Sequence, residues 1–275
     1  MTRHDIFADL HAAGCFVMPN PWDAGSARVM AAMGAQALAT SSAAHAFTLG
    51  RPDMGGVTRD EALAHAEDIV AATPLPVSGD LENGFGDTPE AVADTIRLAA
   101  GAGLSGCSIE DTQMVSGNPA YDFDLAVERI RAGVAAVRAL GRPFVLTARA
   151  DGVMNGAYEM AEGIRRLKAF EGAGADCLYL PLPPDLDGLR RVLSAVSAPV
   201  NALAAGALAR EDVASLAAAG VRRISLGSMP ARVTHAALVG AMAGIYERGT
   251  FEGFAGAASG DAIDALLRKG RNPNA

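Results

Sequence analysis

Short apolar runs alternate with longer segments of helical periodicity along almost the whole chain. Eight of these runs predict β-strands, at residues 15–20, 37–42, 75–82, 106–111, 144–151, 177–183, 199–204 and 222–228. A helix-like segment follows each run, which is the pattern of parallel βα units. Eight such units predict a (β/α)8 TIM barrel. A doubly wound open sheet shows the same alternation and is the alternative.

The two ends of the chain lie outside this repeat. A helix near residues 4–13 is expected to cover the bottom of the barrel, and the tail at 250–275 is expected to form a C-terminal helical extension. Between them no linker or low-complexity segment interrupts the pattern. We therefore predict a single barrel domain over residues 1–275. Thr58 and Glu61 have capping-box spacing, and Thr88 precedes a proline as an N-cap would.

Composition narrows the function. The 275 residues are 50% hydrophobic and carry a formal charge of −8, without a basic tract, which argues against nucleic acid or an anionic membrane as a partner. No apolar run is long enough to span a bilayer. The odd, scattered cysteines Cys15, Cys107 and Cys177 predict buried small hydrophobes instead of disulfides, and a cytoplasmic location.

Polar residues gather where the predicted strands end. The third strand runs into SGDLENGFGD, residues 78–87, which is rich in acids and glycines. The polar residues at the strand ends are Thr40, Ser41, Ser42, Asp80, Glu82, Glu110, Asp111, Arg149, Asp151, Asn201 and Ser228. Because active sites of such barrels lie at the carboxyl ends of the strands, this asymmetry predicts a site there.

Strand alternation groups these side chains further. Residues two apart share a face, so Asp80 and Glu82 are expected to point the same way and to converge with Glu110. Three crowded carboxylates without His or Cys favour Mg²⁺, with Mn²⁺ possible in its place. Arg149 would then bind an anionic substrate. Taken singly, the acids also fit a solvated loop, and Arg149 fits a structural ion pair.

Other polar residues favour structural roles. Asp87 precedes the Thr88 cap and is expected to support the helix start. His45 and His235 are interpreted as structural histidines. Ser228, in SLGS, is interpreted as a loop residue, although it also leaves a weak phosphate-binding hypothesis, and with it a sugar-phosphate isomerase, open.

Several of these stretches match one family in combination. The segment MPNPWDAGSARVMAAMGAQALATSSAAHAFTLGRPD, followed by PVSGDLENGFGD, SIED and LTARAD, resembles the isocitrate lyase/phosphoenolpyruvate mutase superfamily. The resemblance covers about residues 5–235. It implies an (α/β)8 barrel that binds Mg²⁺ and a 2-oxo acid. It also implies a homodimer or homotetramer in which the last barrel helix is swapped between subunits.

The resemblance implies roles for individual residues. Asp80 resembles the direct metal ligand, with Glu82, Glu110 and Asp53 as its companions, largely through water. Arg149 resembles the arginine that binds the substrate, and together with Asp80 it would be catalytic. The implied substrate-binding residues are Trp22, Ser41, Ser42, Ala43, Arg149 and Asn201, and Asp23 lies beside Trp22 at the rim.

Departures from the family pattern narrow the expected reaction. The loop after Glu110, DTQMVSGNPAYDF, lacks the cysteine, lysine and histidine of the lyase branch, and Thr112 and Gln113 stand where the mutase and hydrolase branch has a lysine. The sixth strand ends in LPLPP, without the glutamate or histidine of better-known branches. Oxaloacetate-type decarboxylation through a metal-bound pyruvate enolate needs no loop acid to break the bond, so the resemblance favours this Mg-dependent lyase reaction. The alternatives are a methylisocitrate-like C–C lyase, P–C chemistry of the phosphoenolpyruvate mutase or phosphonopyruvate hydrolase type, and a non-catalytic 2-oxo acid binder.

Overall fold

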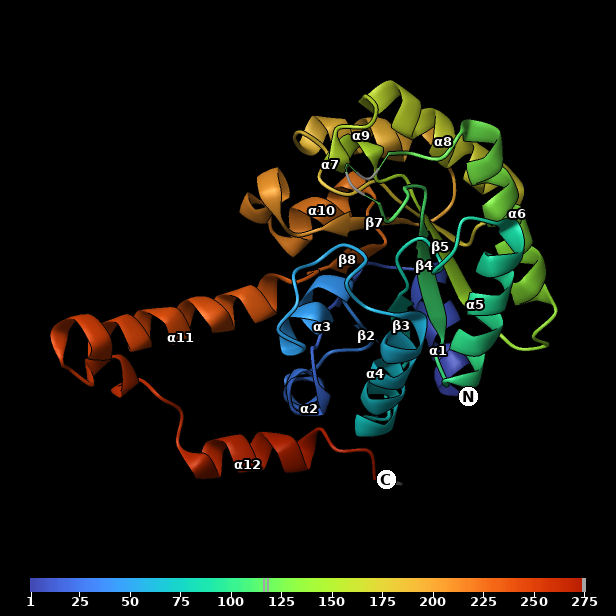
Figure 1. Cartoon of the computed structure of the whole chain (residues 1–275). Helices are drawn as coiled ribbons and strands as arrows, with labels where there is room; N and C mark the ends of the chain where they lie inside the picture. Colours follow the sequence, from blue (N-terminus) through green and yellow to red (C-terminus); the bar gives the residue numbers. More distant parts are fainter. Residues whose placement is uncertain (116, 118, 274–275) are drawn as a thin grey trace.

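Eight parallel strands form a nearly closed barrel with helices outside it (Figure 1). The computed structural model describes residues 1–273 except 116 and 118. The strands are β1 (Phe16–Met18), β2 (Leu38–Ala39), β3 (Val77–Asp80), β4 (Gly106–Glu110), β5 (Val145–Arg149), β6 (Cys177–Tyr179), β7 (Val200–Leu203) and β8 (Arg223–Ser225). Each lies within a predicted apolar run. The predicted (β/α)8 barrel is confirmed.

The order of the strands excludes the open-sheet alternative. The hydrogen-bonded order is β1-β8-β7-β6-β5-β4-β3-β2, and the first and last strands pair in parallel with Phe16 opposite Arg223. An open doubly wound sheet would leave both of these strands far apart. Between β1 and β2 the backbone N–H of Ala39 donates to the carbonyl of Pro19 over 3.1 Å. This bond lies across the remaining gap in the barrel.

Helices and short 3₁₀ turns follow the strands. The main outer helices are α2 (Ala24–Ala32), α4 (Arg59–Ala72), α5 (Pro89–Gly101), α6 (Phe123–Arg138), α8 (Met160–Ala173), α9 (Leu186–Ala195), α10 (Val213–Ala219) and α11 (Met229–Arg248). Shorter elements sit in the loops, namely α3 (Ser42–Thr48), α7 (Gly152–Asn155) and η1 (Gly206–Arg210). The Thr58 capping box and the Thr88 N-cap with proline at N1 are both confirmed. Each cap satisfies a backbone N–H that the first helical turn leaves without a partner.

The first helix, α1 (Arg3–Ala12), covers the bottom of the barrel as predicted. Phe7 is fully buried and meets Phe16 edge to face, with ring centroids 6.5 Å apart. At Gly106, a Cβ atom would lie 2.8 Å from the Phe7 ring, so only glycine allows this close approach. The helix therefore closes the amino ends of the strands with aromatic packing.

The C-terminal region leaves the barrel and returns to it (Figure 1). Helix α11 projects outward, and its exposed apolar residues are Val233, Leu238, Val239 and Tyr246. After η2 (Glu252–Phe254), helix α12 (Gly260–Lys269) packs on α2 of its own chain, where a Cβ at Gly270 would overlap the Arg28 carbonyl. Exchange of a helix between subunits stays a prediction.

The three cysteines form no disulfide in the fold. Cys107 and Cys177 are buried, Cys15 is half-buried, and all three are free thiols. Burial raises the pKa of the Cys177 thiol, which keeps it protonated. In the described part of the chain no helix is long and apolar enough to cross a membrane.

Candidate active site

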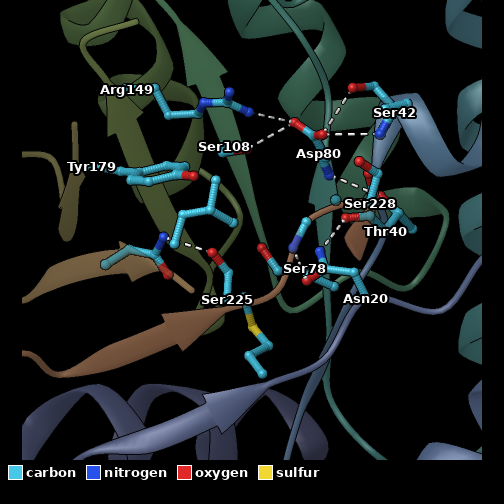
Figure 2. Close-up of a pocket in the computed structure, with 18 of the residues that line it drawn as sticks. Asn20, Thr40, Ser42, Ser78, Asp80, Ser108, Arg149, Tyr179, Ser225 and Ser228 are labelled. Carbon is cyan, nitrogen blue, oxygen red and sulfur yellow. Dashed lines mark hydrogen bonds and ion pairs between the residues drawn. The ribbon is translucent and has the colours of Figure 1, made fainter. Parts of the chain in front are cut away.

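A cavity of about 160 Å³ opens at the carboxyl ends of the barrel strands (Figure 2). Its polar lining comes from loops or strand ends that are far apart in sequence. The polar lining residues are Asn20, Thr40, Ser41, Ser42, Asp53, Ser78, Asp80, Ser108, Arg149, Tyr179, Asn201, Arg223, Ser225 and Ser228. The structure thus places most of the predicted strand-end residues around one space.

Asp80 faces this cavity and is held from several sides. Its Oδ2 accepts hydrogen bonds from the backbone N–H of Ser42 at 2.9 Å and from the Ser42 hydroxyl at 3.0 Å. Its Oδ1 accepts from the Ser108 hydroxyl at 3.3 Å and from Arg149 at 2.8 Å (Figure 2). The backbone of Asp80 is also fixed, because its N–H donates to the Thr40 hydroxyl. The carboxylate is therefore preorganised at the mouth of the barrel.

Arg149 contacts three carboxylates at once. Its Nη1 lies 2.8 Å from Asp80 and 2.9 Å from Glu110, and its Nη2 lies 2.7 Å from Asp151. Burial alone would lower the pKa of Arg149, but the three acids raise it well above its ordinary value. The guanidinium is thus a permanent cation at the mouth of the barrel.

Three acids surround one arginine, and the pKa values of two of them, Glu110 and Asp151, are raised. Burial raises the pKa of Glu110 well above its ordinary value, and the opposing charge of Arg149 offsets only part of that effect. Burial also raises the pKa of Asp151, again against the pull of Arg149. One guanidinium cannot neutralise three carboxylates, so a proton or a further cation would relieve the repulsion among them.

Glu82 and Asp53 are two further acids near this cluster. Glu82 is buried and takes a left-handed backbone angle, φ +47°, because β3 ends at Asp80 and the chain turns there. It faces a small adjoining cavity with Asp80 and not the main cavity, since strand alternation stops with the strand. Burial first, and the charge of Asp80 second, raise the pKa of Glu82 to about 7. Asp53 does line the main cavity, and loss of hydration raises its pKa.

The donor set fits a largely hydrated hard cation. Among the described residues no group of three or more His, Cys, Asp or Glu side chains is arranged to hold a metal ion directly. Mg²⁺ commonly keeps several waters and takes only one or two carboxylates from the protein. Asp80, which lines the cavity, would be such a direct ligand, and Glu110, Glu82 and Asp53 would act through water. The binding of Mg²⁺ by these four acids stays a prediction.

The predicted substrate-binding residues divide into two groups. Ser41, Ser42, Ala43 and Asn201 line the main cavity with Arg149. Trp22 does not: it lines a separate surface depression beside His45 and His65, and its carbonyl is 3.0 Å from His65 Nε2. The adjoining Asp23 caps α2 through the Ser26 backbone N–H.

Sequence reasoning missed a row of residues on the cavity wall. Tyr179 lies under Arg149, with the guanidinium 5.1 Å from its ring centre, and the Ser225 hydroxyl accepts a hydrogen bond at 2.9 Å from Asn201, which had been predicted. Asn20 holds the loop after β8 by accepting from the backbone N–H groups of Leu226 and Gly227. Strand alternation applied to RRISLGS would have turned Ser225 inward. No comparable signal marked Tyr179, whose run looked apolar.

The loop after β4 is tied down at its end. Residues 116 and 118 of this loop lie outside the described residues, and Thr112 forms an isolated antiparallel bridge with Ala120. The Tyr121 hydroxyl donates to Asp87 at 2.6 Å and accepts from Asn83 at 2.8 Å. Asp87 therefore anchors this loop, while the helix start is capped by Thr88 instead.

Comparison with known proteins agrees with the geometry. The sequence model of the phosphoenolpyruvate phosphomutase family matches residues 7–246. An uncharacterized protein of Mycobacterium tuberculosis is 34% identical over 228 residues, 82% of each chain. An oxaloacetate decarboxylase of Paraburkholderia xenovorans is 33% identical over 200 residues, 70% of this chain and 64% of the relative. A Burkholderia cenocepacia crystal structure, described only as a lyase/mutase, has 46% identity and a TM-score of 0.92, with 96% of this chain and 95% of that chain covered.

The chain belongs to the phosphoenolpyruvate phosphomutase family, so the resemblance predicted from its motifs is confirmed. Named relatives of this chain include lyases and decarboxylases. Because these relatives carry different activities, membership alone does not assign the reaction.

Proposed function

We propose that this protein cleaves a carbon–carbon bond of a small 2-oxo dicarboxylic acid, with oxaloacetate-type decarboxylation as the reaction. The observation that carries the proposal is the small polar cavity in which Asp80 and Arg149 form an ion pair at the barrel mouth. At about 160 Å³ it suits a compact acid better than a large one, since drug-sized ligands occupy roughly 300–1,000 Å³. The similarity to a named oxaloacetate decarboxylase supports the same reaction.

Different residues of the cavity would have different roles in the proposed decarboxylation. Ser42 orients Asp80, while Ser41 and Ala43 line the adjoining wall, where they would hold the carboxylate next to the carbonyl. Arg149 would stabilise the negative charge on the C2 oxygen as the C3–C4 bond breaks and its electron pair moves toward the carbonyl. Carbon dioxide leaves, and a proton from water then restores C3. Mg²⁺ bound at Asp80 would supply a Lewis acid for the same oxygen.

The proposal is tested with one substrate panel. Purified protein with Mg²⁺ is incubated with oxaloacetate, 2-methylisocitrate, 2,3-dimethylmalate and phosphonopyruvate, and pyruvate and CO₂ are measured. We expect both products from oxaloacetate above the rate of its spontaneous decay, and loss of that excess with EDTA. Oxaloacetate decay at the uncatalysed rate, with or without Mg²⁺, would refute the decarboxylase.

A carbon–carbon lyase acting on a 2-hydroxy diacid is the second candidate. It needs a base for the hydroxyl proton, and a carboxyl with a pKa of about 7, such as Glu82, suits that task. Pyruvate or another 2-oxo acid released from 2,3-dimethylmalate or 2-methylisocitrate without CO₂ would favour it. Phosphonopyruvate turnover would instead indicate P–C chemistry, and binding of oxalate without turnover of any panel member would indicate a non-catalytic binder.

We propose further that the protein is a homo-oligomer. Val233, Val239 and Tyr246 of α11 are 65%, 67% and 83% exposed in the isolated chain. An outward helix with several exposed large apolar side chains is typical of a surface that another subunit covers. A dimer or tetramer with an exchanged helix would bury this surface.

A further inference from the structure

A second arginine, Arg223, also lines this cavity. It is the first residue of β8, and only 3% of its surface is exposed. Strands rise about 3.3 Å per residue, so Arg223 lies about 7 Å deeper in the barrel than Ser225. The cavity thus has one arginine near its mouth and one at its floor.

Small side chains keep the barrel open down to this depth. Interiors of such barrels are usually filled by bulky branched residues. Here Ala39, Ser78 and Ser108 line the cavity on neighbouring strands, and Ala39 pairs in register with Ser78. None of these three side chains is large enough to fill the centre. The floor at Arg223 is therefore continuous with the space beside Asp80.

The partners of Arg223 are neutral. Its Nε donates to Asn201 Oδ1 at 2.8 Å, and its Nη1 lies 3.4 Å from His11 Nε2. His11 Nδ1 is 2.8 Å from the Phe7 carbonyl and must donate to it, so Nε2 is left as an acceptor. Burial, and after it the nearby charge of Arg223, lower the pKa of His11 to about 3, so this ring is uncharged.

The two arginines therefore differ in their charge balance. Arg149 contacts three carboxylates, whereas Arg223 forms no ion pair with any Asp or Glu of the described residues. A buried charge without a counter-ion is costly. An anion in the cavity would supply the missing partner, and Arg223 already lines the space that it would enter.

We propose that Arg223 forms a deep anion subsite that receives the second carboxylate of a dicarboxylic substrate. This inference deepens the proposed function and rests on it for the placement of the 2-oxo acid group near Asp80 and Arg149. Arg223 is then a specificity-determining residue, and Asn201 holds its guanidinium in place. The site selects four-carbon diacids over monocarboxylic acids of the same type.

The first test uses wild-type protein with Mg²⁺ and three ligands that cannot decarboxylate. L-Malate and L-lactate differ only in that malate carries the second carboxylate, and oxalate occupies only the upper part of the site. Calorimetric titration is expected to show malate binding about tenfold or more tightly than lactate, which is the range of one charge-assisted hydrogen bond. Equal affinity for malate and lactate would overturn the proposal.

The second test uses Arg223→Met with Arg222→Met as the matched control. Arg222 is the preceding residue, and its side chain bonds the Gly14 carbonyl outside the cavity. Arg223→Met is expected to abolish the preference for malate and to change oxalate affinity less than twofold, while Arg222→Met keeps both. A folded Arg223→Met protein that retains the preference would show that Arg223 only anchors α1, and would refute the subsite.

A third variant covers the case in which Arg223→Met does not fold. Asn201→Asp keeps an acceptor for the Arg223 Nε but adds a counter-ion, so it should also remove the preference for malate. Retention of the preference in that variant contradicts the proposal. These binding results are independent of turnover. Malate selectivity without oxaloacetate decarboxylation would refute the proposed reaction alone, and decarboxylation without selectivity would refute the subsite alone.

Discussion

Arg149 and Asp151 are joined by two nearly parallel hydrogen bonds across a single intervening residue. The Nε of Arg149 lies 3.1 Å from Oδ1, and Nη2 lies 2.7 Å from Oδ2. This bidentate arrangement fixes the plane of the guanidinium. It leaves Nη1 to point at Asp80 and Glu110, toward the cavity. Asp151 is therefore a positioning residue for the cation that the proposed reaction uses.

Replacing Asp151 by asparagine removes its charge while keeping its shape. One side of the fork is lost, and we expect kcat/KM for oxaloacetate to fall about 10- to 100-fold, mainly through kcat. Steady-state kinetics measures this. Asp187→Asn is the control, because Asp187 forms an exposed ion pair with Arg190. A change confined to thermal stability, with kcat intact, would contradict the positioning role.

Asp80→Asn tests the metal prediction directly. Asparagine can keep an oxygen toward Ser42 but cannot supply an anionic ligand. We expect Mg²⁺ to raise the melting temperature of the wild type and not of the variant, and turnover to fall at least about 100-fold. Asp94→Asn, in the surface pair with Arg97, is the matched control. An equal shift with Mg²⁺ in both proteins would rule out Asp80 as the metal ligand.

Tyr121→Phe tests the anchor of the loop after β4. Loss of the hydroxyl leaves Asp87 and Asn83 without a shared partner, which should lower the free energy of unfolding by about 1–3 kcal/mol. Urea denaturation measures the loss. Tyr246→Phe is the control, since Tyr246 is 83% exposed. Similar stability of the two variants would mean that the anchor contributes little.

Replacing Val239 by aspartate tests the proposed oligomer interface. A charge in a buried apolar contact is costly, so the variant should shift toward smaller species in size-exclusion chromatography with light scattering. Val213→Asp is the control, because Val213 is 50% exposed on α10, away from the α11 surface. A monomeric wild-type protein would disprove the oligomer outright.

Much of this fold follows from periodicity alone. Strand and helix patterns alternate because each unit must bury one face, whereas closure of the barrel was established only by the pairing of β1 with β8. Ser41, Asp80 and Arg149 could be placed at one rim because parallel strands align their carboxyl ends. Glu82 could not be placed, since alternation stops where β3 ends and a positive φ turns the side chain elsewhere.

Long-range polar contacts were beyond the reach of the sequence. Nothing local in Asp87 indicates that a tyrosine far along the chain will bond to it. Arg223 carries a signal only in hindsight: a charged residue at an inward position of a buried strand needs a partner, and the sequence does not show which one. Such pairings depend on three-dimensional closure.

Burial of His11, next to Arg223, makes the stability of the fold depend on pH. Buried His11 has a folded-state pKa of about 3, below its ordinary value of 6.5, with Arg223 and Arg222 as the charged groups that oppose its protonation. A depressed histidine pKa means that the unfolded chain binds the extra proton. Neutral His11 therefore makes its full contribution to the free energy of unfolding above pH 6.5, and this contribution is lost as the pH falls toward 3.

His11→Gln should remove this dependence, because glutamine stays neutral. Between pH 6.5 and 5.0 the wild type should lose about 1.6 kcal/mol more unfolding free energy than the variant, because the unfolded histidine is half protonated at pH 6.5 and almost fully protonated at pH 5.0. Urea unfolding of both proteins at the two pH values gives the difference. His235→Gln is the control, because His235 is exposed on α11. Equal pH slopes for wild type and His11→Gln would show that His11 titrates normally, and that the floor of the barrel is hydrated.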